Sequence, residues 1–153
     1  MLILVALIIV LLCSNCEDEK NFILLTNNSS KTIYADWSIY YPDTSSINTI
    51  PIYYDWNKIL PNDEFGLMGI RHSTWKSTFE YHKIDTLMIY IFDEEVLKNN
   101  TWGNVIRYYL VLQRYDLSLQ DLEKLNWKIY YPPTEAMKDI KMFPPYKEEG
   151  YDD

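Results

Sequence analysis

The sequence predicts a mainly β fold: a β-sandwich-like domain with two or three short helices near the C-terminal half. Short segments of β-branched and aromatic residues, separated by turn residues, are typical of strands in such a fold. Aromatic residues make up 16% of the 153 residues, including 14 Tyr and 5 Trp, which suits the large inward side chains of two packed sheets. A two-layer α+β arrangement, in which the helices cover one sheet, is the alternative.

The N-terminal half contains four candidate strands. A short apolar run over 22–25 precedes the turn-forming residues "TNNSS". Residues 32–41 alternate so that Trp37, Ile39 and Tyr41 share one face, and Pro42 ends the segment because it has no N–H to donate. Two further strands are expected over 49–54 and 64–70, with "LPNDE" as the turn between them.

The C-terminal half has the stronger pattern. The segment "DTLMIYIFD" (85–93) contains a continuous apolar run, which predicts a strand buried on both faces. A helical segment is expected next, over 93–107. The segment "RYYLVLQRYD" (107–116) then predicts another strand. Ser118 and Asp121 have the spacing of a reciprocal helix cap, and Asn126 is suited to a left-handed stop before a last strand over 127–131.

The first residues predict export. Residues 2–12 are continuously apolar, which matches the about 7 to 15 residues of a signal peptide and is shorter than the about 20 needed to span a bilayer. The expected organisation is a signal peptide over 1–15, an acidic tether over 16–21, one β-rich domain over 22–133, and a short helix with an acidic tail over 134–153. A short membrane anchor that is never cleaved is the alternative for the first segment.

Two resemblances refine this expectation. The stretch around Cys16 resembles a bacterial lipoprotein signal, in which that cysteine is lipidated, and "CEDEK" resembles the acidic start of surface-exposed lipoproteins in Bacteroidetes. Residues 110–146 resemble a group of uncharacterised small lipoproteins of Bacteroides and relatives. These resemblances imply a lipoprotein of the cell envelope, in the outer membrane, with display at the cell surface as one option. They assign no activity and no functional residues.

Several classes of function find no support in the sequence. The net charge is −8 and Lys and Arg are not clustered, so nucleic acid is not an expected partner. His72 and His82 lack the spacing of a zinc pair, and 4 Gly leave no phosphate-binding loop, so we expect neither a metal nor another cofactor. No catalytic motif is found, which favours a protein that is not an enzyme.

The aromatic excess provides the leading hypothesis for function. Rings with a polar tip favour stacking on sugars or burial in protein interfaces, so we expect a glycan or a protein partner. The candidate surface residues are Tyr40, Tyr54, Trp102, Tyr109 and Tyr130.

Two alternatives stay open. One is a small envelope hydrolase that uses His72 or His82 with a carboxylate, and the other is an inhibitor or immunity-type lipoprotein that meets a basic partner. Thr86 lies in a triplet, "DTL", that resembles an O-glycosylation site of Bacteroidetes.

Overall fold

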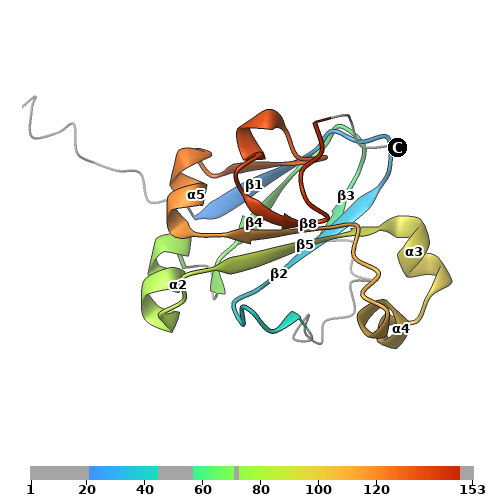
Figure 1. The fold of residues 1–153 in the computed structure, drawn as a ribbon, viewed down its shortest axis with the longest axis horizontal. Helices are drawn as coiled ribbons and strands as arrows, with labels where there is room; N and C mark the ends of the chain where they lie inside the picture. Colours follow the sequence, from blue (N-terminus) through green and yellow to red (C-terminus); the bar gives the residue numbers. More distant parts are fainter. Residues whose placement is uncertain (1–20, 45–56, 71–72, 149–153) are drawn as a thin grey trace, which may run out of the picture.

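Over the residues that the structure describes, the protein is an α+β structure with two sheets and four short helices (Figure 1). The computed structural model describes residues 21–44, 57–70 and 73–148. Of these residues, strands account for 33% and helices for 28%, and the sheets do not close into a barrel. The expected pair of sheets is therefore present, but the mainly β class is too narrow, because helices contribute almost as many residues as strands.

The smaller sheet has three strands in the order β4-β1-β7. Its central strand, β1 (Phe22–Asn27), pairs antiparallel with β4 (Glu64–Met68) and parallel with β7 (Lys128–Tyr131). The first strand of the domain is thus held between strands from both halves of the chain, a long-range pairing that periodicity alone does not predict.

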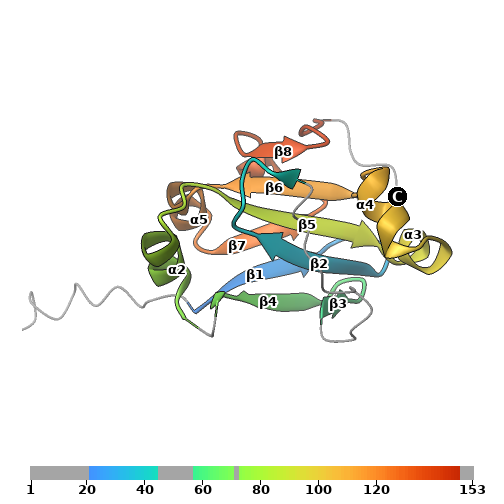
Figure 2. The same ribbon diagram turned by 90° about the horizontal axis from the view of Figure 1, so that it is seen from below.

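The larger sheet has five strands in the order β3-β2-β5-β6-β8, and all its neighbours are antiparallel (Figure 2). Its strands are β2 (Ile33–Ser38), β3 (Lys58–Ile59), β5 (Leu87–Asp93), β6 (Gln113–Leu117) and β8 (Lys141–Phe143). Because β8 pairs with β6, the sheet extends beyond residue 133, where the sequence placed the end of the domain. The strand expected over 49–54 lies outside the described residues.

The main core lies between the two sheets. Alternate residues of each strand point into it, among them Ile23 and Leu25 of β1 and Ile89 and Ile91 of β5, all fully buried. The other side of β5 is buried as well, since Met88, Tyr90 and Phe92 pack with Leu97 and Val105 in a second cluster. The prediction that this strand is buried on both faces is confirmed.

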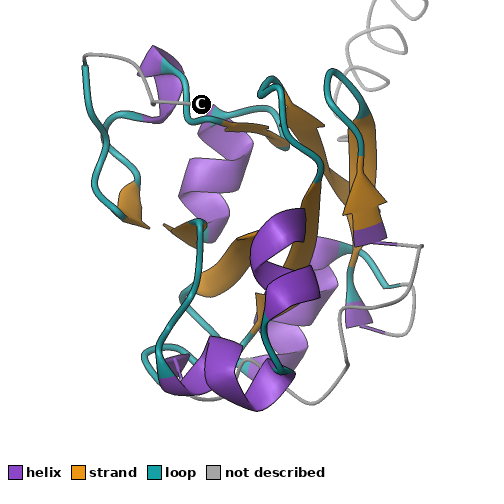
Figure 3. Ribbon diagram, turned by 90° about the vertical axis from the view of Figure 1, so that its right-hand side faces the viewer, coloured by secondary structure: helices purple, strands orange, loops and turns teal. Residues whose placement is uncertain are grey.

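Helices α3 (Glu94–Asn99) and α4 (Trp102–Arg107) contribute to this second cluster through Leu97 and Val105. Both helices lie at the end of the molecule that faces the viewer in Figure 3. The sequence predicted one helical segment over 93–107, whereas the structure has these two separate helices. The strand expected over 107–116 is shorter, because Tyr108 N–H and Leu110 N–H donate to the carbonyls of Asn104 and Val105 and close the end of α4. Strand β6 therefore begins only at Gln113.

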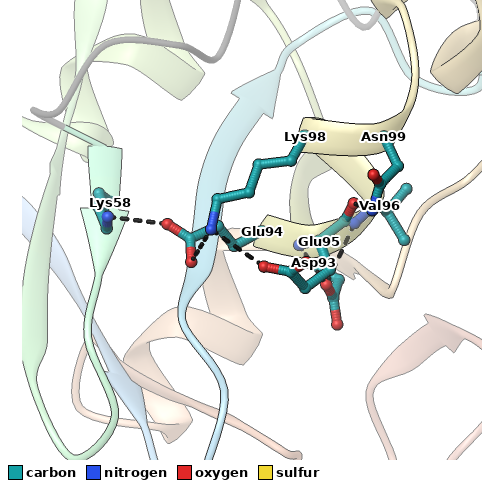
Figure 4. Close-up of polar contacts among 7 residues, drawn as sticks. All are labelled: Lys58, Asp93, Glu94, Glu95, Val96, Lys98 and Asn99. Carbon is teal, nitrogen blue, oxygen red and sulfur yellow. Dashed lines mark hydrogen bonds and ion pairs between the residues drawn. The ribbon is translucent and has the colours of Figure 1, made fainter.

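An ion-pair network joins α3 to β3 (Figure 4). Glu94 contacts Lys58 at 2.8 Å and Lys98 at 3.0 Å, and these hydrogen bonds lower the pKa of Glu94. Asp93 caps the helix by accepting from the N–H groups of Glu95 and Val96. The Lys58–Glu94 pair links the two elements, whereas the pairs of Lys98 lie within α3. Ion pairs near the surface each contribute little to stability.

The other end of the molecule carries α2 (Trp75–His82) and α5 (Leu119–Lys124) (Figure 1). Helix α2 was not predicted; Trp75 is fully buried and donates its indole N–H to the carbonyl of Leu67 at 2.8 Å. Helix α5 begins with the expected reciprocal cap between Ser118 and Asp121, and Asn126 adopts a positive φ of 51°. Both predictions for this segment are confirmed.

A 3-10 turn, η5 (Glu135–Met137), lies where the sequence predicted a short helix. Within the described ranges, no helix has the length and apolar character required to cross a bilayer.

Candidate functional site

The outer face of the five-stranded sheet carries polar side chains at its centre. The pairing register of β5, β6 and β8 aligns Tyr90, Arg114 and Phe143 in one row across the strands. The next row aligns Asp116 with Lys141. Since successive side chains alternate between faces, these residues point away from the main core, into which Tyr115 points.

A buried ion pair forms the base of this surface. Arg114 Nε lies 2.8 Å from Asp116 Oδ1, and Arg114 Nη2 donates to Asp116 Oδ2 at 3.1 Å. The Asp116 side chain is 1% exposed and that of Arg114 is 15% exposed. Two contacts between the guanidinium and the carboxylate hold the plane of the arginine in one orientation.

Two tyrosine hydroxyls bind the cations of this surface. Arg114 Nη1 donates to Tyr109 Oη at 2.6 Å, and Lys141 Nζ donates to Tyr41 Oη at 2.6 Å. The cations lie farther from the ring centres, at 5.9 Å for Arg114 and 5.1 Å for Lys141. Each cation thus contacts its tyrosine through the hydroxyl group and also lies within the range of a cation–π contact with the ring.

Phe143 packs against Tyr109. The two ring centres are 5.4 Å apart, and the angle between the ring planes is 61°. We call this group the aromatic–cation cluster; its members are Tyr41, Tyr109, Arg114, Asp116, Lys141 and Phe143. It holds two cations and one carboxylate, and so has a positive net charge on a chain whose net charge is −8.

The pKa values of Tyr109, Lys141 and Tyr90 are raised above their ordinary values. Burial raises the pKa of Tyr109, although the nearby Arg114 opposes this. The hydrogen bond to Tyr41 raises the pKa of Lys141. Burial also raises the pKa of Tyr90, whose hydroxyl donates to Met88 Sδ at 3.2 Å beneath the cluster. The cluster can therefore offer cations and hydroxyl groups to a ligand.

An open hollow of about 620 Å³ adjoins the cluster. It is lined by residues 138–142 together with Pro145, Tyr146 and Glu148. Lys141 belongs both to this lining and to the cluster, so the two form one continuous surface along β8. The lining combines charged groups with apolar side chains and one aromatic ring.

The five aromatic residues expected at a binding surface do not form one patch. Tyr109 belongs to the cluster, and Tyr40 is 57% exposed beside Tyr41. Trp102 packs on Phe92 at 5.6 Å in the second core cluster. Tyr130 lies on β7 of the smaller sheet, where it is half-buried, and Tyr54 lies outside the described residues.

Sequence reasoning missed most of the cluster. It assigned Tyr41 to the core face with Trp37, on the assumption that alternation continues to residue 41, whereas β2 ends at Ser38. The alternation of Arg114 and Asp116 within one strand was a usable signal, because opposite charges two residues apart share a face. Lys141 and Phe143 gave no such signal, since their strand was not predicted.

The remaining sequence candidates lie elsewhere. His82 is exposed at the end of α2, with its ring 5.0 Å from that of Tyr81, and His72 is not among the described residues. Over 21–44, 57–70 and 73–148, no three His, Cys, Asp or Glu side chains are grouped as metal ligands would be. Thr86 is half-buried just before β5, and Cys16 lies outside the described ranges.

Comparison with protein-family models, with curated proteins and with solved structures gives no match to this chain. The fold and the site define a two-sheet α+β domain with an aromatic–cation surface on the outer face of its larger sheet. Any statement about function therefore rests on the residues themselves.

Proposed function

We propose that this chain is an exported lipoprotein, anchored in the outer membrane through a lipid on Cys16, whose domain binds a glycan through the aromatic–cation cluster. The observation that carries the binding proposal is the arrangement of Tyr109 and Phe143 beside the cations of Arg114 and Lys141. The apolar run over 2–12 and the cysteine that follows it support the anchor.

The chemistry of the cluster fits a sugar. Aromatic rings offer flat apolar faces to the C–H groups of a pyranose, while cations and hydroxyls bind its oxygen atoms. Phe143 is 46% exposed, so this aromatic residue of the cluster is accessible from solvent. The open hollow along β8 provides room for a chain of sugars rather than for one enclosed molecule.

A glycan-binding screen with the chain over 16–153 tests this function. Phe143→Ala should reduce binding at least tenfold while the melting temperature stays within a few degrees of the parent, because roughly 1.4 kcal/mol of contact energy corresponds to tenfold in affinity. Tyr81→Ala is the matched control, since Tyr81 is 83% exposed on α2, at the end of the molecule away from α3 and α4.

Two outcomes would contradict the proposal, whereas loss of binding together with a lower melting temperature would show only unfolding. Equal binding by the parent, Phe143→Ala and Tyr81→Ala would exclude the cluster. Capture of a protein from the cell surface, with no glycan bound, would favour a protein interface on the same residues. The anchor is tested separately, by the mass of the N-terminal peptide from native cells: an acylated Cys16 is expected, and Cys16→Ala should release the chain from membranes.

A further inference from the structure

The outer face of the smaller sheet has an apolar end next to the start of the domain. Phe22 of β1 and Met68 of β4 are direct cross-strand partners, and they are 52% and 49% exposed. Both point away from the core, because their neighbours Ile23 and Leu67 point into it. We call this surface the anchor-side face; it comprises Phe22, Leu24, Gly66, Met68 and Lys128.

The composition of this face changes along the strands. Leu24 lies opposite Gly66 on one side and opposite Lys128 on the other. A Cβ on Gly66 would lie 3.5 Å from the ring of Phe22, so the ring covers the glycine and is held against the sheet. The acidic residue of the face, Glu64, pairs with Thr26 at the far end of the strands. The end nearest residue 21 is thus apolar with one cation beside it.

The number of residues between Cys16 and Phe22 limits how far a lipid on Cys16 can lie from the anchor-side face. Five residues, 17–21, separate Phe22 from Cys16. Fully extended, they let the Cα of Phe22 stand at most about 20 Å from the Cα of Cys16. A lipid on Cys16 would hold the bilayer within that distance of Phe22 and Met68, and apolar side chains partition into the boundary between headgroups and acyl chains.

On this basis, and resting on the lipidation of Cys16 in the proposed function, we propose that the anchor-side face lies on the membrane surface through Phe22 and Met68. The two sheets pack with their inner faces together, so the outer face of the larger sheet is on the opposite side of the molecule. The aromatic–cation cluster then points away from the bilayer. The anchor consequently orients the domain as well as retaining it.

Vesicles of phosphatidylethanolamine and phosphatidylglycerol with brominated acyl chains test this orientation. The chain over 16–153 has a single cysteine, Cys16, which can be coupled to a maleimide lipid in the vesicle. Bromine quenches an indole only near contact, and the parent chain, with its five tryptophans, provides the baseline. Phe22→Trp should lose more emission than the parent in brominated vesicles, and Tyr108→Trp should lose no more than the parent.

Tyr108 is the matched reporter because it is 61% exposed and adjoins Tyr109, which packs on the outer side of the larger sheet. If Phe22→Trp does not fold, Met68→Trp reports on the same face. Equal quenching of the reporters on the two faces, or stronger quenching at residue 108, would overturn the orientation.

The coupling is chemical, so this result does not depend on lipidation in the cell. An unmodified Cys16 in native cells would instead remove the anchor from the proposed function and leave the vesicle result standing.

Discussion

Arg114 Nε lies 2.8 Å from Asp116 Oδ1, and the aspartate side chain is only 1% exposed. Both residues belong to β6, and their side chains are neighbours on one face of the sheet. A carboxylate so far removed from water needs its cation, and the cation in turn is oriented toward Tyr109. The pair thus serves both the packing of the sheet and the geometry of the candidate site.

Breaking this pair should be costly. Asp116→Ala leaves a largely buried guanidinium without its partner, and we expect a loss of about 3 kcal/mol in the free energy of unfolding, measured with denaturant. The double variant Arg114→Met with Asp116→Leu should recover most of it, because no charge is left buried. Lys124→Ala, which breaks an exposed pair with Asp139 at 3.5 Å, should cost at most about 1 kcal/mol. A similar small loss for Asp116→Ala would show that the pair is open to solvent.

Asn27 should be needed for the turn between β1 and β2. Its Nδ2 donates to the carbonyls of Lys31, Ile59 and Leu60, and its Oδ1 accepts from Ser29. Asn27→Ala leaves buried carbonyls without donors and should lower the free energy of unfolding by about 2 to 3 kcal/mol.

Asn27→Asp should be at least as damaging as Asn27→Ala, because a carboxylate oxygen would then face the carbonyl oxygens. Asn28→Ala is the control, since Asn28 is exposed, and thermal melting of the three variants distinguishes them. Equal melting temperatures for the variants of Asn27 and Asn28 would refute this role.

Asp36 should make stability depend on pH. Burial raises the pKa of Asp36 from 3.8 to about 6, although the N–H of Trp37, which donates to Oδ1 at 2.7 Å, opposes this. The folded chain therefore binds a proton more tightly than the unfolded chain. The stabilisation from this proton is fully present below pH 3.8 and is lost as pH rises through about 6.

Asp36→Asn keeps an acceptor for the Trp37 N–H and cannot ionise. The variant should be more stable than the parent at pH 7, by up to about 3 kcal/mol, and should lose this advantage near pH 4. Denaturant unfolding at both pH values measures the difference. An equal effect of the substitution at the two pH values would contradict a raised pKa.

Substitution by alanine should change the stability of the fold in opposite directions at two glycines, Gly69 and Gly103. A Cβ on Gly69 would lie 2.6 Å from the carbonyl oxygen of Ser73 and 2.9 Å from Thr78 Oγ1, so the approach of β4 to α2 requires a glycine. Gly69→Ala should destabilise the fold by about 1 to 3 kcal/mol, the usual cost of overpacking.

Gly103 in α4 has no atom within 4 Å of the corresponding Cβ. Gly103→Ala should stabilise the fold by about 0.5 to 1 kcal/mol through helix propensity. Melting temperatures that shift in the same direction for both substitutions would be inconsistent with this structure.

Helices and strands could be predicted from the sequence where their pattern depends on residues close together in the chain. The continuous apolar run of β5 and the reciprocal cap between Ser118 and Asp121 depend on neighbours in the chain, and both appear as expected. Helix α2 was missed because its buried residues, Trp75, Thr78 and Phe79, form only a short stripe over eight residues. The share of helix was underestimated for the same reason.

By itself the sequence determined the existence of two packed sheets, the strand buried on both faces, the helix cap at Ser118, and the expectation of export. Only the tertiary structure decided that β1 lies between β4 and β7, that β8 joins the sheet, and that Tyr41, Tyr109, Arg114 and Lys141 meet. The physical reason is that pattern and capping act between residues a few positions apart. Tyr41 and Lys141, in contrast, are 100 positions apart and meet only once the larger sheet has formed.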